Sequence, residues 1–136
     1  MNDLMGGQVD FMCDQIVNVV SNVEAGAIKA YAVTTPERVD SLPDLPTLSE
    51  SGLEGFDVAV WHGLYAPAGT PEEVIGKLSA ALQAALQDPK VVERFADLGT
   101  EPVAQDRATP AALDQHLQAE IAKWRPIIEG AGVYAD

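Results

Sequence analysis

The side chains of this sequence that could do chemistry are few and lie far apart. There is no GxSxG, no glycine-rich phosphate loop, no CxxC and no HExxH. The two histidines, His62 and His116, lack the spacing of a metal-binding pair, and each is expected to be a structural or surface residue. The sequence therefore argues against an enzyme with a nucleophile, a nucleotide or a metal, and no cofactor is expected.

Asp14 is the carboxylate with the most informative position. It follows an apolar run at 9–13, which is typical of a buried strand, and it precedes an expected helix at 16–24. In open α/β sheets ligands bind beyond the carboxyl ends of the strands, so Asp14 and the adjacent Gln15 could contact a ligand. Aspartate is also a good N-cap, so Asp14 could simply cap the helix. The sequence leaves both interpretations open.

Polar and aromatic residues at the ends of later segments are the other candidates. Thr34 and Thr35 follow a second expected strand at 28–33, where they either contact a ligand or only open a loop. Trp61 and Tyr65 lie in an extended segment, where they either pack in a core or form the wall of a cleft. The candidate ligand-binding residues are Asp14, Gln15, Thr34 and Trp61.

The elements that must position these residues follow from local signals. Three helix starts combine a capping residue with a proline: Thr70-Pro71-Glu72-Glu73, which fits a capping box, Asp88-Pro89 and Thr109-Pro110. Glycines past the last apolar residue are expected to end helices, at Gly6-Gly7, Gly26 and Gly99. A short helix is expected over 47–51.

Strand, helix and strand follow one another in the first part of the chain, at 9–13, 16–24 and 28–33. This order is that of a βαβ unit with parallel strands, which indicates an α/β fold. A turn-rich segment at 34–55 and a third extended segment at 56–66 come next. Cys13, within the first strand, is expected to be a buried, inert thiol.

Composition excludes several classes of protein. The 8 Lys and Arg residues against 21 Asp and Glu residues give a net charge of 8 − 21 = −13. Without clustered basic residues the chain is not expected to bind nucleic acid or an anionic membrane. One cysteine excludes an internal disulfide, and 47% hydrophobic residues are enough for a packed core.

Four motifs, taken in order, resemble one family. They are Gly6-Gly-Gln-Val-Asp-Phe-Met12, the segment 25–34, Pro43-Asp-Leu-Pro-Thr-Leu-Ser-Glu-Ser-Gly52 and Trp61-His-Gly-Leu-Tyr-Ala-Pro-Ala-Gly-Thr-Pro71. The chain is similar to the extracytoplasmic solute receptors of tripartite tricarboxylate transporters, also called Bug proteins. The resemblance covers essentially the whole chain.

The resemblance implies a periplasmic-binding-protein-like (type II) partial fold. It consists of a βαβ unit with parallel strands, a crossover strand and three C-terminal helices. The chain matches only the C-terminal half of these two-domain proteins. Residues 1–60 would be part of the second ligand-binding domain, and residues 61–136 would be the crossover segment and helices of the first, or helices swapped in a dimer. The leader peptide of a periplasmic protein would then lie upstream of Met1, since this chain shows no signal peptide.

The resemblance also implies a function, as the solute-binding component (a fragment or half-length form) of a tripartite tricarboxylate-type transporter that binds a small carboxylate in an interdomain cleft. Asp14 matches the acidic position after the second-domain strand, on the cleft side, with Gln15 and Thr34 beside it. An acidic residue selects an amino or hydroxyl group and repels a bare carboxylate. The expected partners are a small carboxylate, membrane transporter subunits and a second copy of the chain. The alternative function is a self-associating half-length module that forms a domain-swapped homodimer. An enzyme using Asp14 with His62 is the least supported interpretation.

Overall fold

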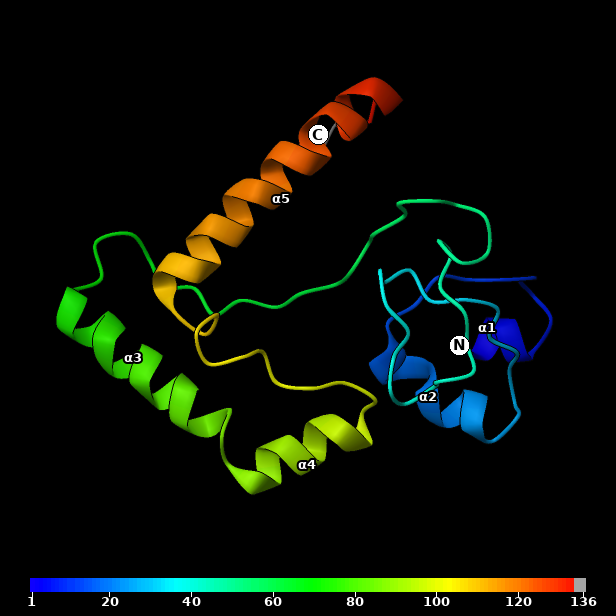
Figure 1. Ribbon diagram of the computed structural model, residues 1–136, viewed down its shortest axis with the longest axis horizontal. Helices are drawn as coiled ribbons and strands as arrows, with labels where there is room; N and C mark the ends of the chain where they lie inside the picture. Colours follow the sequence, from blue (N-terminus) through cyan, green and yellow to red (C-terminus); the bar gives the residue numbers. More distant parts are fainter. Residues whose placement is uncertain (134–136) are drawn as a thin grey trace. The chain divides into compact units, whose positions relative to one another are not determined.

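The computed structural model describes residues 1–133, and these contain five helices (Figure 1). The helices are α1 (Asn2–Met5), α2 (Ile16–Glu24), α3 (Glu72–Ala85), α4 (Pro89–Asp97) and α5 (Pro110–Ala131). The expected helix at 16–24 and the three expected C-terminal helices are all present. Within residues 1–133 no helix combines the length and the apolar character needed to cross a membrane.

The start of α5 agrees with the sequence analysis, because Thr109 is its N-cap. The Thr109 hydroxyl accepts the backbone N–H of Ala112 at 3.2 Å, and Pro110 occupies the first helical position. Proline is well suited to that position because its missing N–H would have had no partner within the helix. Helix α4 likewise begins at the proline, Pro89, that the sequence predicts.

The expected capping box at the start of α3 is wrong. The N-cap is Pro71 and the helix begins at Glu72, with no side-chain hydrogen bond at the cap. The Thr70 hydroxyl instead donates to the carbonyl of Pro67 at 2.8 Å. Threonine hydroxyls bind nearby backbone carbonyls in turns as readily as they cap helices, and here the preceding turn takes the hydroxyl.

The predicted glycine stop of α4 is confirmed in detail. Gly99 has φ of +73°. The Gly99 N–H donates to the carbonyl of Ala96, and the Thr100 N–H donates to the carbonyl of Phe95. This pair of bonds is the Schellman motif, which satisfies carbonyls left free at the end of a helix. Glycines with positive φ and an equivalent pair of bonds also follow α1, α2 and α5, at Gly7, Gly26 and Gly132.

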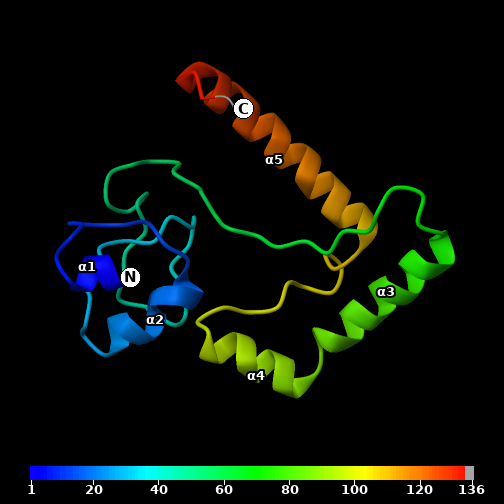
Figure 2. The ribbon, with the colours of Figure 1, turned by 180° about the vertical axis from the view of Figure 1, so that it is seen from behind.

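The expected strands do not form within residues 1–133. The described residues contain one isolated parallel bridge, between Val33 and Thr47, and the runs at 9–13 and 56–66 are drawn as coil in both views (Figures 1 and 2). Val33 instead bonds to the turn that follows it, since its N–H reaches the carbonyl of Pro46 and its carbonyl accepts the N–H of Leu48. A strand requires a partner strand for its backbone groups, and the described residues provide none.

The apolar run at 9–13 is consequently exposed. Phe11 is 79% exposed and Cys13 is an exposed free cysteine. The expectation that Cys13 is buried is therefore wrong for this structure. Burial was inferred from a strand inside a sheet, and without the neighbouring strands the side chains of this run have nothing to pack against.

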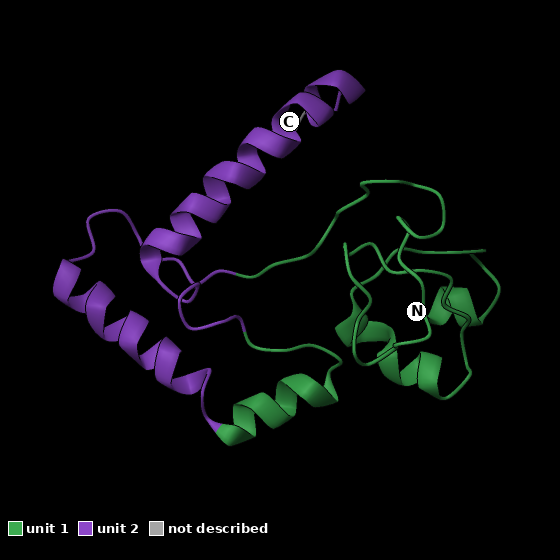
Figure 3. Ribbon diagram, in the orientation of Figure 1, with its two compact units in different colours: residues 1–62, 89–102 green, residues 63–88, 103–136 purple. Residues whose placement is uncertain are grey.

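The chain forms two compact units (Figure 3). Unit 1 consists of residues 1–62 and 89–102, and unit 2 consists of residues 63–88 and the chain from Val103 onward. The chain therefore passes between the units three times. The assignment of 1–60 and 61–136 to the two domains of a longer receptor stays a prediction.

Helix α2 forms the best-packed part of unit 1. Val20, which is 6% exposed, and Ile16 lie on the face of α2 against the backbone of Gly99. The Ser41 hydroxyl donates to the Gly99 carbonyl at 3.3 Å, so the end of α4 is tied to the loop as well.

Polar contacts between α3 and the segment before α5 organise unit 2. Gln83 donates through its side-chain amide to the carbonyl of Ala108 at 2.9 Å. The amide of Gln105 donates to the Gln83 carbonyl at 3.3 Å. Ala108 is buried, with 7% of its surface exposed. The segment before α5 is thus held on α3 by a reciprocal pair of glutamine side chains.

Gly99→Ala should destabilise the chain by about 1–3 kcal/mol, because an alanine would be held at positive φ. Its Cβ would also lie 3.0 Å from the Ser41 Oγ and 3.3 Å from Val20 Cγ2. Gly76→Ala is the control. It lies inside α3 with nothing within 4 Å of the added Cβ, and it should stabilise by about 0.5–1 kcal/mol. Urea denaturation measures both, and changes of the same sign would contradict this account of Gly99.

Candidate ligand-binding site

All four candidate residues belong to unit 1. Asp14 is exposed and lies one residue before the N-cap of α2, which is Gln15. Its Oδ1 accepts the backbone N–H of Gln15 at 2.7 Å and the side-chain amide of Asn18 at 2.8 Å. Asp14 therefore does not cap the helix in the usual way, and the N-cap residue Gln15 makes no side-chain capping hydrogen bond to α2.

The contacts of Asp14 keep its carboxyl group charged. Donation from the Asn18 amide, and then from the Gln15 backbone N–H, lowers the pKa of Asp14 below its ordinary value of 3.8. Both donors bind Oδ1, and the other oxygen, Oδ2, accepts no hydrogen bond from residues 1–133. Asp14 is thus a fixed, exposed anion with one oxygen open to an external donor.

Thr34 is held by its backbone and keeps its side chain unbonded. It is half-buried, and its carbonyl accepts the N–H of Val58 at 2.9 Å. Its hydroxyl makes no hydrogen bond within the described part of the chain, whereas the Thr35 hydroxyl donates to the carbonyl of Glu37 at 2.7 Å. Of the two threonines, Thr34 is the one whose hydroxyl can take up an external partner.

One pair of the candidate residues is in direct contact. Asp14 and Gln15 share a hydrogen bond, while no hydrogen bond joins Asp14 to Thr34 among residues 1–133. Trp61 is half-buried near the end of the first stretch of unit 1. Tyr65, considered with it as a cleft wall, belongs to unit 2 and packs beside Gly63. The joint ligand-binding role of the four residues stays a prediction.

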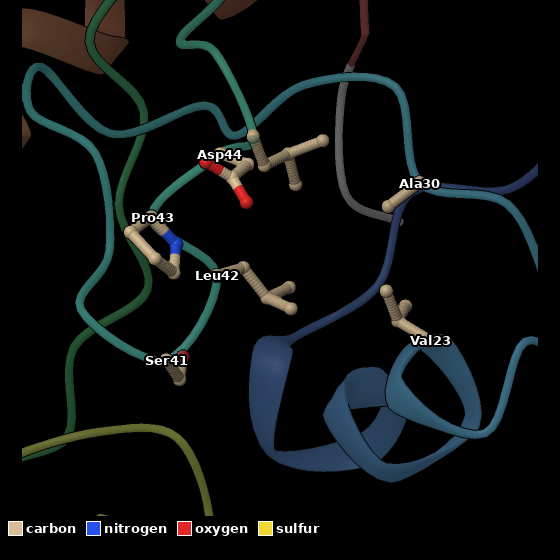
Figure 4. Close-up of a pocket in the computed structure, with 7 residues that line it drawn as sticks. Val23, Ala30, Ser41, Leu42, Pro43 and Asp44 are labelled. Atoms are coloured by element: carbon tan, nitrogen blue, oxygen red, sulfur yellow. The ribbon is translucent and has the colours of Figure 1, made fainter.

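A shallow hollow of about 280 Å³ lies elsewhere in unit 1 (Figure 4). Val23 of α2, Ala30 and the loop 41–45 line it, and Asp44 is the charged residue among them. It includes none of the candidate residues, and its lining is mainly apolar. A small carboxylate would find no cationic group there, so this hollow is a poor candidate for the site.

A polar network that the sequence analysis missed surrounds Thr47. Thr47 is 2% exposed, its N–H donates to Glu50 Oε2 at 2.7 Å, and its hydroxyl accepts the N–H of Glu50 at 3.0 Å. The sequence signal was present, since Thr47-Leu-Ser-Glu50 has the spacing of a capping box. The expected helix over 47–51 is a hydrogen-bonded turn here, which Gly52 ends with φ of +109°.

Arg38 completes this network. Its Nε donates to both carboxylate oxygens of Glu50, at 3.1 and 3.0 Å, and its Nη1 donates to the carbonyl of Pro43 at 3.0 Å. Donation from Arg38, and then from the backbone of Thr47, lowers the pKa of Glu50 below its ordinary 4.5. The pairing is structural, because both carboxylate oxygens of Glu50 have partners within the loop.

No group of three His, Cys, Asp or Glu residues within 1–133 is arranged to hold a metal ion. His62 and Asp14, the pair of an enzymatic interpretation, share no hydrogen bond among these residues. Among the candidate residues, Asp14 offers an exposed anion and Thr34 offers a hydroxyl without a partner in the described part of the chain.

Asn18→Ala should raise the pKa of Asp14 toward 3.8, because it removes the main donor to the carboxylate. The stabilisation that Asp14 gives is present above pH 3.8 and is lost as the pH falls through its lowered pKa. The variant should therefore lose less stability on acidification. NMR titration of the Asp14 carboxyl carbon measures this, with Asn22→Ala on the same helix as control. An unchanged titration in Asn18→Ala would show that the hydrogen bond is absent in solution.

Comparisons with known proteins identify the family to which the chain is similar. Residues 1–133 match the tripartite tricarboxylate transporter family receptor. An Agrobacterium vitis UPF0065 protein is 53% identical over 132 residues, which are 97% of this chain and 38% of that protein. The solved structure of the periplasmic binding protein BugD matches with a TM-score of 0.91 and 48% identity, over 100% of this chain and 45% of that one. The solved structure of MatC from Rhodopseudomonas palustris, with bound malate, matches with a TM-score of 0.86 and 44% identity. The match covers 93% of this chain and 43% of that one.

These matches support a periplasmic-binding-protein-like fold and confirm the resemblance seen in the motifs. The chain spans less than half the length of the relatives just described. The match over residues 1–133 leaves the assignment clear: the chain belongs to the tripartite tricarboxylate transporter receptor family.

Proposed function

We propose that the chain acts as the solute-binding component, or part of the solute-binding component, of a tripartite tricarboxylate-type transporter. It binds a small carboxylate in an interdomain cleft, in the periplasm, and delivers it to membrane subunits. The family match over residues 1–133 carries this proposal. The 44% identity to a protein solved with malate indicates the ligand class.

The proposed fold of the working receptor completes the elements that stay unpaired here. The runs at 9–13 and 28–33 become parallel strands on either side of α2, and 56–66 becomes the crossover strand. Residues 1–60 contribute to the second ligand-binding domain, and residues 61–136 contribute the crossover segment and helices to the first. The exposed apolar side chains of these runs support the proposal, because a sheet would bury them.

Asp14 and Thr34 are the proposed ligand contacts that this chain contributes, with Gln15 and Trp61 beside them. The free Oδ2 of Asp14 accepts from a hydroxyl or amino group of the ligand, while the Thr34 hydroxyl donates to a ligand oxygen. Because Asp14 repels a carboxylate, the carboxylate end lies against backbone N–H groups and the threonine. This arrangement suits a hydroxy acid or an amino acid better than an unsubstituted diacid.

A second candidate function is a self-associating module without transport ligand. Its support is the exposed apolar surface of unit 1, where Tyr31 is 72% and Val60 is 63% exposed. Surfaces of this kind often mark interfaces between proteins. The net charge of −13 works against it, since two copies would repel each other.

A thermal-shift screen with malate, citrate, aspartate and unsubstituted dicarboxylates tests the transport function. A ligand that binds only the folded chain raises its stability by about 2.7 kcal/mol at a hundredfold excess over Kd. Malate or aspartate should give the largest shift, and Asp14→Ala should reduce it. Asp10→Ala is the control, as a nearby exposed aspartate. The absence of a shift with every compound would contradict ligand binding by this chain.

Sedimentation separates the second candidate from the first. A self-associating module should sediment at twice the 14.4 kDa mass of the chain at micromolar concentration. High salt should strengthen the association, because it screens the repulsion between acidic copies. A monomer across the micromolar range, in low and in high salt, would rule out the self-associating module.

A further inference from the structure

We infer that Arg38 and Glu50 are positioning residues for the ligand contact at Thr34. They contact no ligand themselves. They hold the loop 35–57 in the one conformation that fixes the backbone on both sides of the Thr34 hydroxyl. The inference rests on the proposed function and adds to it two residues outside the candidate set of Asp14, Gln15, Thr34 and Trp61.

Arg38 holds the loop 35–57 together through its hydrogen bonds. Its guanidinium spans from the Glu50 carboxylate to the Pro43 carbonyl, so three points of the loop meet at one side chain. The planar, always charged guanidinium suits this task because it donates several hydrogen bonds in fixed directions. The side chains of Arg38 and Glu50 are 45% and 48% exposed, which places the closure at the surface.

Glu50, the partner of Arg38, is also hydrogen-bonded to the buried Thr47. Glu50 and Thr47 bind each other reciprocally, carboxylate to backbone N–H and hydroxyl to backbone N–H. The Ser51 hydroxyl adds a bond to the Thr47 carbonyl at 2.8 Å. Thr47 is almost fully buried, so its end of these bonds is shielded from water, which favours one arrangement of the turn.

The turn around Thr47 is hydrogen-bonded to the chain next to Thr34. The residues on either side of Thr47 bind Val33 twice, because Val33 donates to Pro46 and accepts from Leu48, each at 2.9 Å. On its other side Thr34 accepts the N–H of Val58 at 2.9 Å. Thr34 therefore sits between two anchored backbone points, while its hydroxyl has no partner among residues 1–133.

The placement of these contacts distinguishes positioning from general stability. Val20 and Gly99, where α2 packs against the end of α4, share no hydrogen bond with Arg38, Glu50 or Thr47, and the loop reaches Gly99 through Ser41 instead. Loss of the Arg38–Glu50 pair should loosen the loop around Thr34 and leave α2 and α4 packed. An exposed ion pair contributes little to overall stability, so the effect should appear in ligand affinity.

Calorimetric titration with malate tests the affinity. Arg38→Gln and Glu50→Gln should each weaken malate binding about tenfold, and the effects should be less than additive in the double variant, because both disrupt the contact that the two residues share. Glu73→Gln and Lys77→Gln are matched controls. They neutralise an exposed ion pair on α3, with the two charged atoms 2.6 Å apart, and should leave malate affinity unchanged.

Amide hydrogen exchange gives the readout that a general loss of stability would not give. In Glu50→Gln the amides of Val33 and Val58 should exchange faster, while that of Val20 in α2 should not change. Faster exchange with unchanged malate affinity would overturn the positioning role, and so would unchanged exchange at Val33 and Val58. If the unaltered chain does not bind malate or the other carboxylates, the proposed function fails, and exchange still decides whether the pair fixes Thr34.

Discussion

The reciprocal hydrogen bonds between Thr47 and Glu50 are the constraint on which the long loop of unit 1 depends. A chain segment with three prolines and few regular backbone bonds would otherwise have many conformations of similar energy. The buried threonine gives the turn its register, and Arg38 ties the turn to the start of the loop. The single parallel bridge of the described residues forms where this turn meets Val33.

Hydrogen bonds within unit 1 hold the two proposed ligand contacts, Asp14 and Thr34, in place. Asp14 is held by its own helix, through Asn18 and Gln15, and Thr34 is held by the loop. Asp14 is therefore placed by contacts within five residues, and Thr34 by backbone bonds to Val58 and around Val33, and neither set needs a complete sheet. A receptor that closes on its ligand benefits from contacts prepared in advance, because less conformational entropy is lost on binding.

The helices were predictable from the sequence because their signals are local. Proline at the first position, a threonine cap and a glycine beyond the end act over four or five residues. Accordingly α4 begins at Pro89 and is followed by Gly99, and α5 begins at Pro110 after its Thr109 cap. The capping box at Thr70 failed for an equally local reason, since the hydroxyl found a closer acceptor in Pro67. Even the missed network left a local sign, in the spacing of Thr47 and Glu50.

The strands and the full site were not predictable in the same way. An apolar run such as 9–13 favours a strand, but the strand forms only where other strands complete its hydrogen bonds. The expected burial of Cys13 failed with it. Arg38 and Glu50 form an ion pair although they lie 12 positions apart, and no helix or strand periodicity in the sequence predicts such a pair. Whether Asp14, Gln15, Thr34 and Trp61 act together depends on tertiary placement, which sequence spacing does not determine.

One measurement tests the central claim, that unit 1 holds the ligand contacts of a carboxylate receptor. It is an NMR titration of the labelled chain with malate, in which every backbone amide is followed separately. The account predicts saturable shifts at Asp14, Gln15, Thr34 and Trp61, with little change along α5. Shifts concentrated in α3 and α5, or no saturable shift at any residue, would contradict it.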